Sequence, residues 1–312
     1  MKDIAAPMDL RLIQAELTKE KLLRHTNNGG NEIYVITHHD SPVIMKEIGR
    51  LRELTFRSAG GGTGKDLDID NYDTCENPYK QLIVWNPEDK EIIGGYRFYE
   101  CRNTRIDDKE NIKLATAKLF KFSEKFIKDY LPYMIELGRS FVVPSYQARM
   151  SDKQSVKKGL FALDNLWDGL GSLVVNNPDV KYFFGKVTMY PHYIQKARDY
   201  VIYFLKKHFG DTEGLLTPII PVNIATSAEE LKKVFVKDNY LEDYKILFQK
   251  VREIGENIPP LINSYMNLSP TMKVFGTAIN EGFGKVEETG IMVTIGYIYK
   301  TKKDRHLLSP QK

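Results

Sequence analysis

Cysteine and long apolar runs are both scarce in this sequence. The two cysteines among its 312 residues, Cys75 and Cys101, are too few for a zinc site of their own. Without a secretory signal at the start, they are typical of free thiols in a reducing compartment. The longest apolar runs, residues 200–205 and 291–295, fall far short of the roughly 20 residues that span a bilayer. We therefore expect a cytoplasmic protein that does not cross a membrane, while peripheral contact with the inner face of the membrane stays open.

An excess of charge of one sign is also missing. Lys and Arg outnumber Asp and Glu by 45 to 41, a formal net charge of +4, which gives no indication of a nucleic-acid partner. Hydrophobic residues make up 42%, and 18 tyrosines and 15 phenylalanines are available for a core. This composition excludes a disordered or collagen-like chain, and the length permits a sizeable core without disulfides or metal.

Strand and helix patterns alternate along the chain. Hydrophobic alternation and turn residues predict strands over residues 32–37, 81–85, 92–99, 133–143, 182–189, 273–279 and 290–299. Helical spacing and caps predict helices over 10–24, 42–57, 155–175, 193–208 and 226–256, and one that carries Leu119, Phe122 and Phe126. We expect an α/β fold with an N-terminal extension, residues 1–31, and a single domain over 32–312. That domain would hold a helical insertion at about 211–257, a C-terminal β-hairpin and a frayed tail from residue 302.

Two ligand-binding motifs fit this sequence poorly. The segment Ala59-Gly-Gly-Gly-Thr-Gly-Lys65 is similar to a phosphate-binding P-loop, but a helix precedes it and Asp66 replaces the Ser or Thr that holds magnesium. We interpret it as a mobile loop of the kind that covers a site. Asp66, Asp68 and Asp70 imitate a calcium loop whose glycine and bidentate glutamate are missing. A solvated acidic loop is therefore favoured, and no metal site is expected.

The strand predicted over residues 133–143 carries two opposite charges, Glu136 and Arg139, in an otherwise apolar segment. Residues three apart in a regular strand face opposite sides. A β-bulge at Gly138 would turn both side chains toward one side and free a backbone N–H. The pair would then suit a polar cleft in which that amide polarises a carbonyl. A structural ion pair on a sheet face is the alternative.

An ordered series of short motifs carries a family resemblance. The series is Arg52-xxx-Phe56-Arg57, Asp68-x-Asp70-xx-Asp73, Gly94-Gly-Tyr-Arg97 and Glu136-Leu-Gly-Arg139-Ser-Phe-Val142. It resembles the branch of the GNAT acyltransferase superfamily that contains acyl-homoserine-lactone synthases and the amino-acid N-acyltransferases of ornithine-lipid and glycine-lipid synthesis, some of which carry a hemolysin label. The resemblance covers residues 32–208 and returns between 259 and 283. It implies a GNAT-like mixed central sheet flanked by helices, with a bulged central strand.

The resemblance also implies roles for individual residues. It makes Glu136 and Arg139 the catalytic pair, with Glu136 as the base that takes the proton of the attacking amine. The residues implied to shape the acceptor site are Arg52, Phe56, Asp68, Asp70, Asp73 and Arg97. The residues expected to hold the oxyanion through backbone amides are Phe141, Val142 and Val143. No serine or cysteine need be acylated, and no tightly bound cofactor is expected.

The acyl donor leaves a weaker trace in the sequence. Family members hold its phosphates on a glycine turn at a helix start, and a degraded form survives here around Lys157, Lys158 and Gly159. A weak turn favours an acyl carrier protein over acyl-CoA as the donor, and a solvated helix start is the alternative. Two basic segments would suit this acidic partner: residues 196–207, and a helix face with Lys118, Lys121, Lys125 and Lys128.

Together these expectations describe an N-acyltransferase that moves a fatty acyl or 3-hydroxyacyl group from acyl carrier protein to the α-amine of a small amino acid. The product would be an N-acyl amino acid or an aminolipid precursor. One alternative is an acyl-homoserine-lactone-type signal synthase, although the tryptophan usual between the first helix and the acidic loop is absent. The other is a non-catalytic module that binds an acyl carrier or a lipid.

Overall fold

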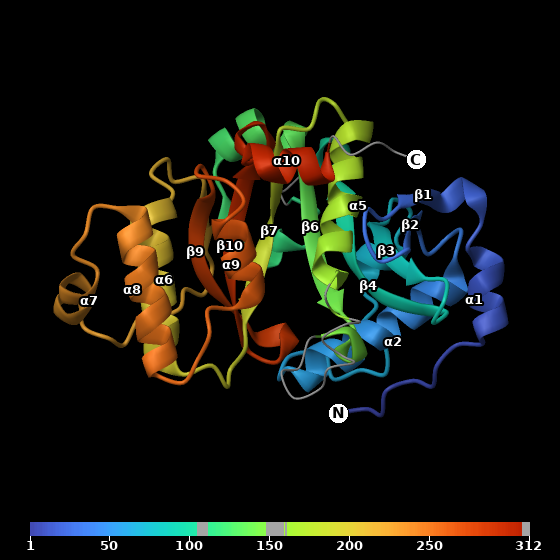
Figure 1. Cartoon of the computed structure of the whole chain (residues 1–312), viewed down its shortest axis with the longest axis horizontal. Helices are drawn as coiled ribbons and strands as arrows, with labels where there is room; N and C mark the ends of the chain where they lie inside the picture. Colours follow the sequence, from blue (N-terminus) through green and yellow to red (C-terminus); the bar gives the residue numbers. More distant parts are fainter. Residues whose placement is uncertain (105–111, 148–158, 160, 308–312) are drawn as a thin grey trace. The chain divides into compact units, whose positions relative to one another are not determined.

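The computed structural model (Figure 1) describes residues 1–104, 112–147, 159 and 161–307. The chain forms two compact units. Unit 1 comprises Met1–Glu100, Ile135–Val180 and Tyr299–Lys312, and unit 2 comprises Cys101–Met134 and Lys181–Ile298. Both units contain strands and helices, which confirms the mixed α/β class.

The strands described in unit 1 form one antiparallel series. In order across the sheet they are β1 Leu22–His25, β2 Glu32–Ile36, β3 Lys80–Asn86, β4 Glu91–Glu100 and β6 Met134–Val142. β3 and β4 are buried over most of their length, as their nearly continuous apolar sequence predicts. They place the residues of the site in register with those of β6.

The helices described in unit 1 lie on both faces of this sheet. They are α1 Leu10–Glu16, α2 Pro42–Ser58, α3 Asn71–Thr74, α5 Ala162–Asn176 and α10 Lys300–His306. α5 packs on one face, where a Cβ added at Gly169 would lie 2.7 Å from the side chain of Leu82. α2 lies on the other face, because its Arg52 contacts Gln81, the strand neighbour of Leu82.

Unit 2 is built around a second antiparallel series of strands. In order they are β7 Tyr182–Met189, β10 Val286–Thr294 and β9 Lys273–Asn280, with a separate ribbon of β5 Phe120–Phe122 and β8 Leu216–Pro218. Its described helices are α6 Gln195–Phe209, α7 Ala228–Val234, α8 Tyr240–Glu253 and α9 Pro260–Met266. The Phe126 ring lies 5.3 Å from that of Phe184 and 6.1 Å from that of Phe275, centroid to centroid, in an aromatic core.

Most of the predicted elements are confirmed. The helix expected over residues 42–57 is α2, the hairpin over 81–99 is β3 and β4, and the strand over 182–189 is β7. β9 and β10 form the expected C-terminal hairpin. The start of the helix predicted from residue 155 lies outside the described residues, and the predicted domain boundaries stay a prediction.

Two predictions near the N-terminus and in unit 2 are wrong. The helix expected over residues 10–24 ends at Glu16, and residues 22–25 form β1 on the sheet, so the extension contributes a strand to the fold. In the helix expected to carry Leu119, Phe122 and Phe126, Phe122 lies instead in the strand β5, while Phe126 begins the short π-helix Phe126–Tyr130. Phe120 is buried while Lys121 is exposed, which is the alternation of a strand. The four lysines at 118, 121, 125 and 128 therefore do not share a helix face.

The expected frayed tail is also wrong in its first part. Residues 300–306 form α10, and His306 Nδ1 lies 2.8 Å from Asp168 Oδ1 on α5. A Cβ at Gly171 of α5 would lie 2.1 Å from the carbonyl oxygen of His306, so the two helices approach closely. This anchoring is a tertiary contact that the charged local sequence does not reveal.

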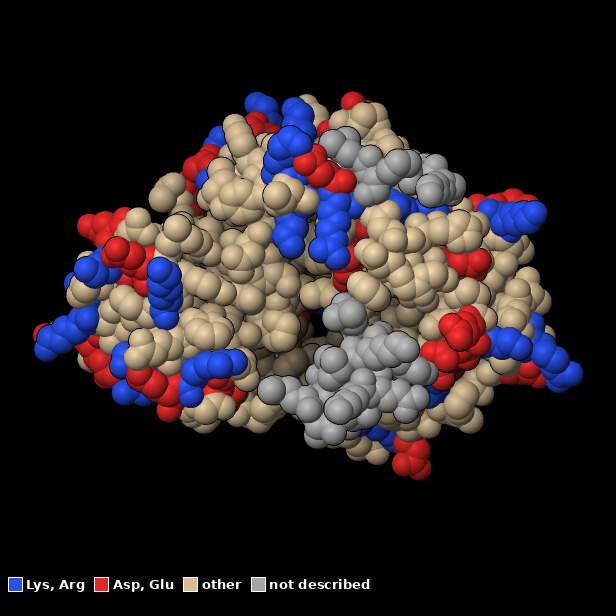
Figure 2. All heavy atoms as spheres, in the orientation of Figure 1, with Lys and Arg blue, Asp and Glu red and all other residues tan. Residues whose placement is uncertain are grey.

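The surface agrees with the composition. On the face shown in Figure 2, acidic and basic side chains are intermixed, as a nearly balanced charge predicts. Within the described part of the chain, no helix is long and apolar enough to cross a membrane.

Candidate active site

A bulge interrupts the pairing of β4 with β6. Gly95 pairs with Phe141 and Arg97 pairs with Gly138, so three residue steps on β6 oppose two on β4. Arg139, inside this interval, has φ 48°, in the left-handed region that non-glycine residues rarely adopt. The predicted bulge is therefore confirmed, but the residue in the unusual conformation is Arg139, one position beyond Gly138.

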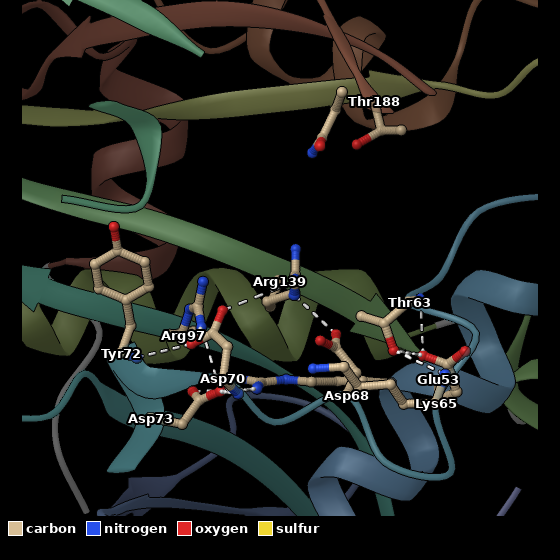
Figure 3. Close-up of polar contacts among 12 residues, drawn as sticks. Glu53, Thr63, Lys65, Asp68, Asp70, Tyr72, Asp73, Arg97, Arg139 and Thr188 are labelled. Atoms are coloured by element: carbon tan, nitrogen blue, oxygen red, sulfur yellow. Dashed lines mark hydrogen bonds and ion pairs between the residues drawn. The ribbon is translucent and has the colours of Figure 1, made fainter. Parts of the chain in front are cut away.

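The bulge brings Glu136 and Arg139 onto the same face of the sheet. Glu136 pairs with Tyr99, two residues along β4 from Arg97, so Glu136 and Arg97 share a face. Arg97 Nη1 lies 2.8 Å from Asp70 Oδ1. Arg139 approaches the same loop, with its Nη2 4.0 Å from Asp70 Oδ2. Figure 3 shows both arginines directed toward the acidic loop.

A glycine pair allows the strands to approach closely at the bulge. A Cβ at Gly94 would lie 2.4 Å from the carbonyl oxygen of Phe141, and one at Gly95 would lie 2.7 Å from that of Leu82. Real Cβ contacts are not this short. Glycine is therefore needed at both positions for a steric reason, because β4 lies very close to its two neighbouring strands.

The acidic loop is held by three arginines, of which Arg52 and Arg97 are buried. Arg139 Nε lies 2.7 Å from Asp68 Oδ2, and Arg52 Nη1 lies 3.3 Å from Asp73 Oδ1. Arg97 Nη1 also lies 3.3 Å from Asp73 Oδ2. The side chains of Asp68 and Asp73 are 1% and 0% exposed, so the expectation of a solvated acidic loop is wrong at Asp68, whereas Asp66 is 53% exposed. The carboxylates of Asp68 and Asp73 are buried because each one meets a guanidinium.

Hydrogen bonds also fix the conformation of the loop. Asp70 is the N-cap residue of α3. Its carboxylate accepts a hydrogen bond from the N–H of Tyr72 at 2.9 Å, and its own N–H donates one to Asp73 Oδ2 at 3.1 Å, so the two aspartates form a capping box. Asp68 N–H donates to the carbonyl of Gly49 on α2 at 2.9 Å. Sequence reasoning missed Gln81, which accepts from Arg52 Nη2 and donates to Asp73 at 3.0 Å. The signal in the sequence that could have revealed Gln81 is a polar side chain in an otherwise apolar strand.

The ion pairs shift the titration of their members. Burial by itself raises the pKa of Asp73, but the charges of Arg52 and Arg97 outweigh it and lower that pKa well below the usual range. Burial by itself lowers the pKa of Arg97, and the carboxylates of Asp73 and Asp70 outweigh it and raise that pKa. The pKa of Arg52 is lowered, chiefly by burial. Asp73 and Arg97 therefore stay ionised around neutral pH and give the site a fixed electrostatic frame.

Glu136 stands beside this frame with a different partner. It is 1% exposed, and its Oε2 accepts a hydrogen bond from the hydroxyl of Tyr79. The Tyr79 ring stacks on that of Tyr99 with centroids 4.8 Å apart, and the Arg97 guanidinium lies 5.1 Å from its centre. Sequence reasoning missed Tyr79, because it lies in the irregular segment directly before β3, where no motif marks it. Phe56, also expected at the site, is buried on α2.

The expected oxyanion amides are only partly available. Val143 N–H donates to the carbonyl of Ile93 at 2.9 Å, so it is committed to the sheet and the expectation for it is wrong. Phe141, two residues earlier in the same register, also directs its N–H toward β4. The backbone N–H of Val142 points away from β4, and its carbonyl accepts a hydrogen bond from Gln147 Nε2 at 2.7 Å. Gly159 is half-buried, while Lys157 and Lys158 lie outside the described residues.

Comparisons with known proteins agree with this geometry. Residues 51–156, which include the loop, the bulge and both arginine-bearing elements, match the acetyltransferase (GNAT) domain model. A glycine N(alpha)-acyltransferase of Phocaeicola vulgatus is 57% identical over 309 residues, 99% of this chain and 94% of that protein. Another, of Bacteroides thetaiotaomicron, is 57% identical over 98% of this chain and 90% of that protein. This chain belongs to the same family of GNAT-domain N-acyltransferases. A solved CoA-dependent acyl-homoserine-lactone synthase, BjaI, is 11% identical over 88% of this chain and 87% of its own, with a TM-score of 0.37.

The glycine-rich loop of this acyltransferase binds one of its own carboxylates. The carboxylate of Glu53 on α2 accepts three hydrogen bonds. They come from the N–H of Thr63 at 2.9 Å, the hydroxyl of Thr63 at 2.7 Å and the N–H of Gly64 at 2.8 Å. Burial by itself raises the pKa of Glu53, but these donors outweigh it and lower the pKa. Two amides of the segment that is similar to a P-loop, those of Thr63 and Gly64, are thus bonded to Glu53 (Figure 3). The loop is also tied to α2 rather than loose.

The carboxylates of this acyltransferase do not form a metal centre in the part of the chain that the structure describes. Among its described residues, no group of three or more His, Cys, Asp or Glu side chains is arranged to hold an ion. Asp68 and Asp70, which suggested a calcium loop, are paired with Arg139 and Arg97 instead.

Proposed function

We propose that this acyltransferase moves a fatty acyl group from a thioester to the α-amine of glycine. The observation that carries the proposal is the 57% identity, over nearly the whole chain, to two glycine N(alpha)-acyltransferases. The site supports it with a buried carboxylate, Glu136, and a cationic side chain, Arg139, on one face of a bulged strand. Amide formation needs a proton acceptor for the amine and a counter-charge for the acceptor's carboxylate.

Proton removal is the first step. The glycine ammonium has no lone pair, so it must lose a proton before it attacks, and Glu136 accepts that proton directly or through one water. The hydroxyl of Tyr79 donates to Glu136 Oε2 and orients the carboxylate. Arg139 supplies the counter-charge for the glycine carboxylate.

Acyl transfer follows from this arrangement. The amine nitrogen attacks the thioester carbonyl, a C–N bond forms, and the tetrahedral oxyanion is stabilised by the N–H of Val142, which points away from β4. The C–S bond then breaks, the thiolate takes the remaining extra proton of the nitrogen, and the products are an N-acylglycine and a free thiol. Glu136 returns its proton to the solvent.

The donor we propose is acyl carrier protein. The sequence at Lys157, Lys158 and Gly159 keeps only a degraded form of the glycine turn that binds the phosphates of coenzyme A, and a carrier protein brings contacts of its own. Its soluble donor and its amphiphilic product fit a cytoplasmic enzyme that works close to the inner face of the membrane. We expect charge reversal at Lys157 and Lys158 together to raise KM for the carrier, with less effect on KM for glycine.

The decisive experiment supplies purified protein with acyl-acyl-carrier-protein or the matching acyl-CoA, and with glycine, alanine, serine or ornithine as acceptor. Thiol release is followed by absorbance and the products by mass spectrometry. We expect N-acylglycine to form in step with thiol, with the highest kcat/KM for the carrier-bound donor. Thiol release without an amide, or acylation of another amino acid in preference to glycine, would contradict the proposal.

A further inference from the structure

Gly138 is a glycine for which the fold gives no reason. It is not among the glycines with positive φ, so its backbone suits any residue. A Cβ added there would meet no atom of the described residues within 4 Å, whereas one at Gly94, on the neighbouring strand, would collide with Phe141. A glycine inside a strand weakens the strand, because its backbone loses more conformational entropy on folding and it has no side chain to pack. The cost without a steric benefit suggests a reason outside the fold.

The open space at Gly138 lies among the groups assigned to the reaction. Gly138 pairs with Arg97 across the strands, and Glu136, two residues earlier, faces the same side. Arg139 follows directly, and the bulge turns its guanidinium to that side, where it meets Asp68 (Figure 3). Gly138 itself is half-buried, so a small molecule has access to it. The open space beside Gly138 therefore lies on the face of the sheet that carries one carboxylate and two guanidinium groups.

We propose that Gly138 keeps open the space that the α-carbon of the acceptor amino acid occupies, and that it thereby determines the acceptor's size. The acceptor's amine faces Glu136 and its carboxylate faces Arg139, which is the charge order that an α-amino acid requires. The bare backbone of Gly138 forms the floor of this space. This inference rests on the proposed function and assigns it an acceptor-binding residue.

The test is a pair of glycine-to-alanine variants. Gly138→Ala adds one methyl group to the proposed space. Gly296→Ala is the matched control in unit 2, because its Cβ also meets nothing within 4 Å and its φ is not positive. We expect Gly138→Ala to raise KM for glycine about tenfold or more, the usual effect of one misplaced methylene-sized group in a pocket. KM for the acyl donor and the melting temperature should stay unchanged, and Gly138→Val should raise KM for glycine further. The control should match the wild type in all three.

Each outcome separates this inference from the proposal beneath it. An active wild type whose two Gly138 variants keep its KM for glycine would overturn the role of Gly138 and leave N-acyl transfer standing. An equal rise in KM for the donor and in KM for the acceptor would also overturn it, because the added methyl group would then disturb the whole strand. A wild type that acylates no glycine would overturn the proposed function itself.

Discussion

Replacing Glu136 with Gln removes one charge from the candidate site and leaves its shape almost unchanged. The carboxylate of Glu136 is 1% exposed and accepts a hydrogen bond from the hydroxyl of Tyr79. A glutamine keeps one oxygen that can accept the same hydrogen bond. It cannot accept the proton of an ammonium group at neutral pH. The substitution therefore separates the role of Glu136 as a base from its role as a hydrogen-bond acceptor.

The magnitudes for the two roles differ. If Glu136 is the base, turnover falls about 10²- to 10⁴-fold, the usual range for the loss of general-base catalysis. The free energy of unfolding falls by about 1–3 kcal/mol, because the new amide group brings a buried donor that needs a partner. If Glu136 serves only as half of a buried charge pair, unfolding loses about 3–5 kcal/mol and each folded molecule keeps its turnover.

The assay measures kcat for N-acylglycine formation and the free energy of unfolding on the same preparations. Tyr79→Phe serves as the companion variant, since it removes the hydroxyl that holds Glu136 while keeping the ring on Tyr99. We expect it to lower kcat by less than Glu136→Gln does. A destabilised Glu136→Gln protein with wild-type kcat per folded molecule would refute the assignment and move the proton acceptor elsewhere, with Asp68 and Asp70 as the next candidates.

Three further predictions concern the frame around the site. Asp73→Asn should lower the free energy of unfolding by about 3–5 kcal/mol at pH 7, because it leaves its buried arginines short of a counter-charge. The pKa of Asp73 is lowered by folding, so its carboxylate stabilises the fold above the unfolded pKa of about 3.9, and the difference between variant and wild type should shrink as urea titrations move below about pH 4. Gly94→Ala should cost about 1–3 kcal/mol through its collision with the Phe141 carbonyl, and equal melting temperatures would contradict the close approach described. Glu53→Gln should speed proteolysis within residues 60–64 without creating affinity for ATP in calorimetry, and ATP binding by the wild type would revive the P-loop interpretation.

The local features of the site were predictable because they depend on short-range patterns. Two opposite charges three apart in an apolar strand, with a glycine between them, predicted the bulge that puts Glu136 and Arg139 on one face. Alternation and turn residues predicted β3 and β4, since the pleat and the hairpin are local properties of the chain. The acidic spacing drew attention to Asp68 and Asp70, although their arginine partners could not be read from that segment alone.

Other features needed the folded chain. Tyr79 reaches Glu136 across 57 positions of sequence, and Gln81 joins Arg52 to Asp73 from a different strand, so no local pattern contains either contact. The position of a carboxylate within the sequence does not reveal whether water or a guanidinium surrounds it. That is why Asp68 was expected to be solvated and proved buried.

By itself the sequence determined the class of fold, most of its strands and long helices, the bulge and the family of acyltransferases, because periodicity, capping and motif order are properties of the chain. Tertiary structure alone decided which groups meet. It paired Asp68, Asp70 and Asp73 with arginines, tied the glycine-rich loop to Glu53 and committed the amide of Val143 to β4. It also left the space at Gly138 open. Hydrogen bonds and ion pairs depend on distances of about 3 Å, and only the packing of segments far apart in sequence sets those distances.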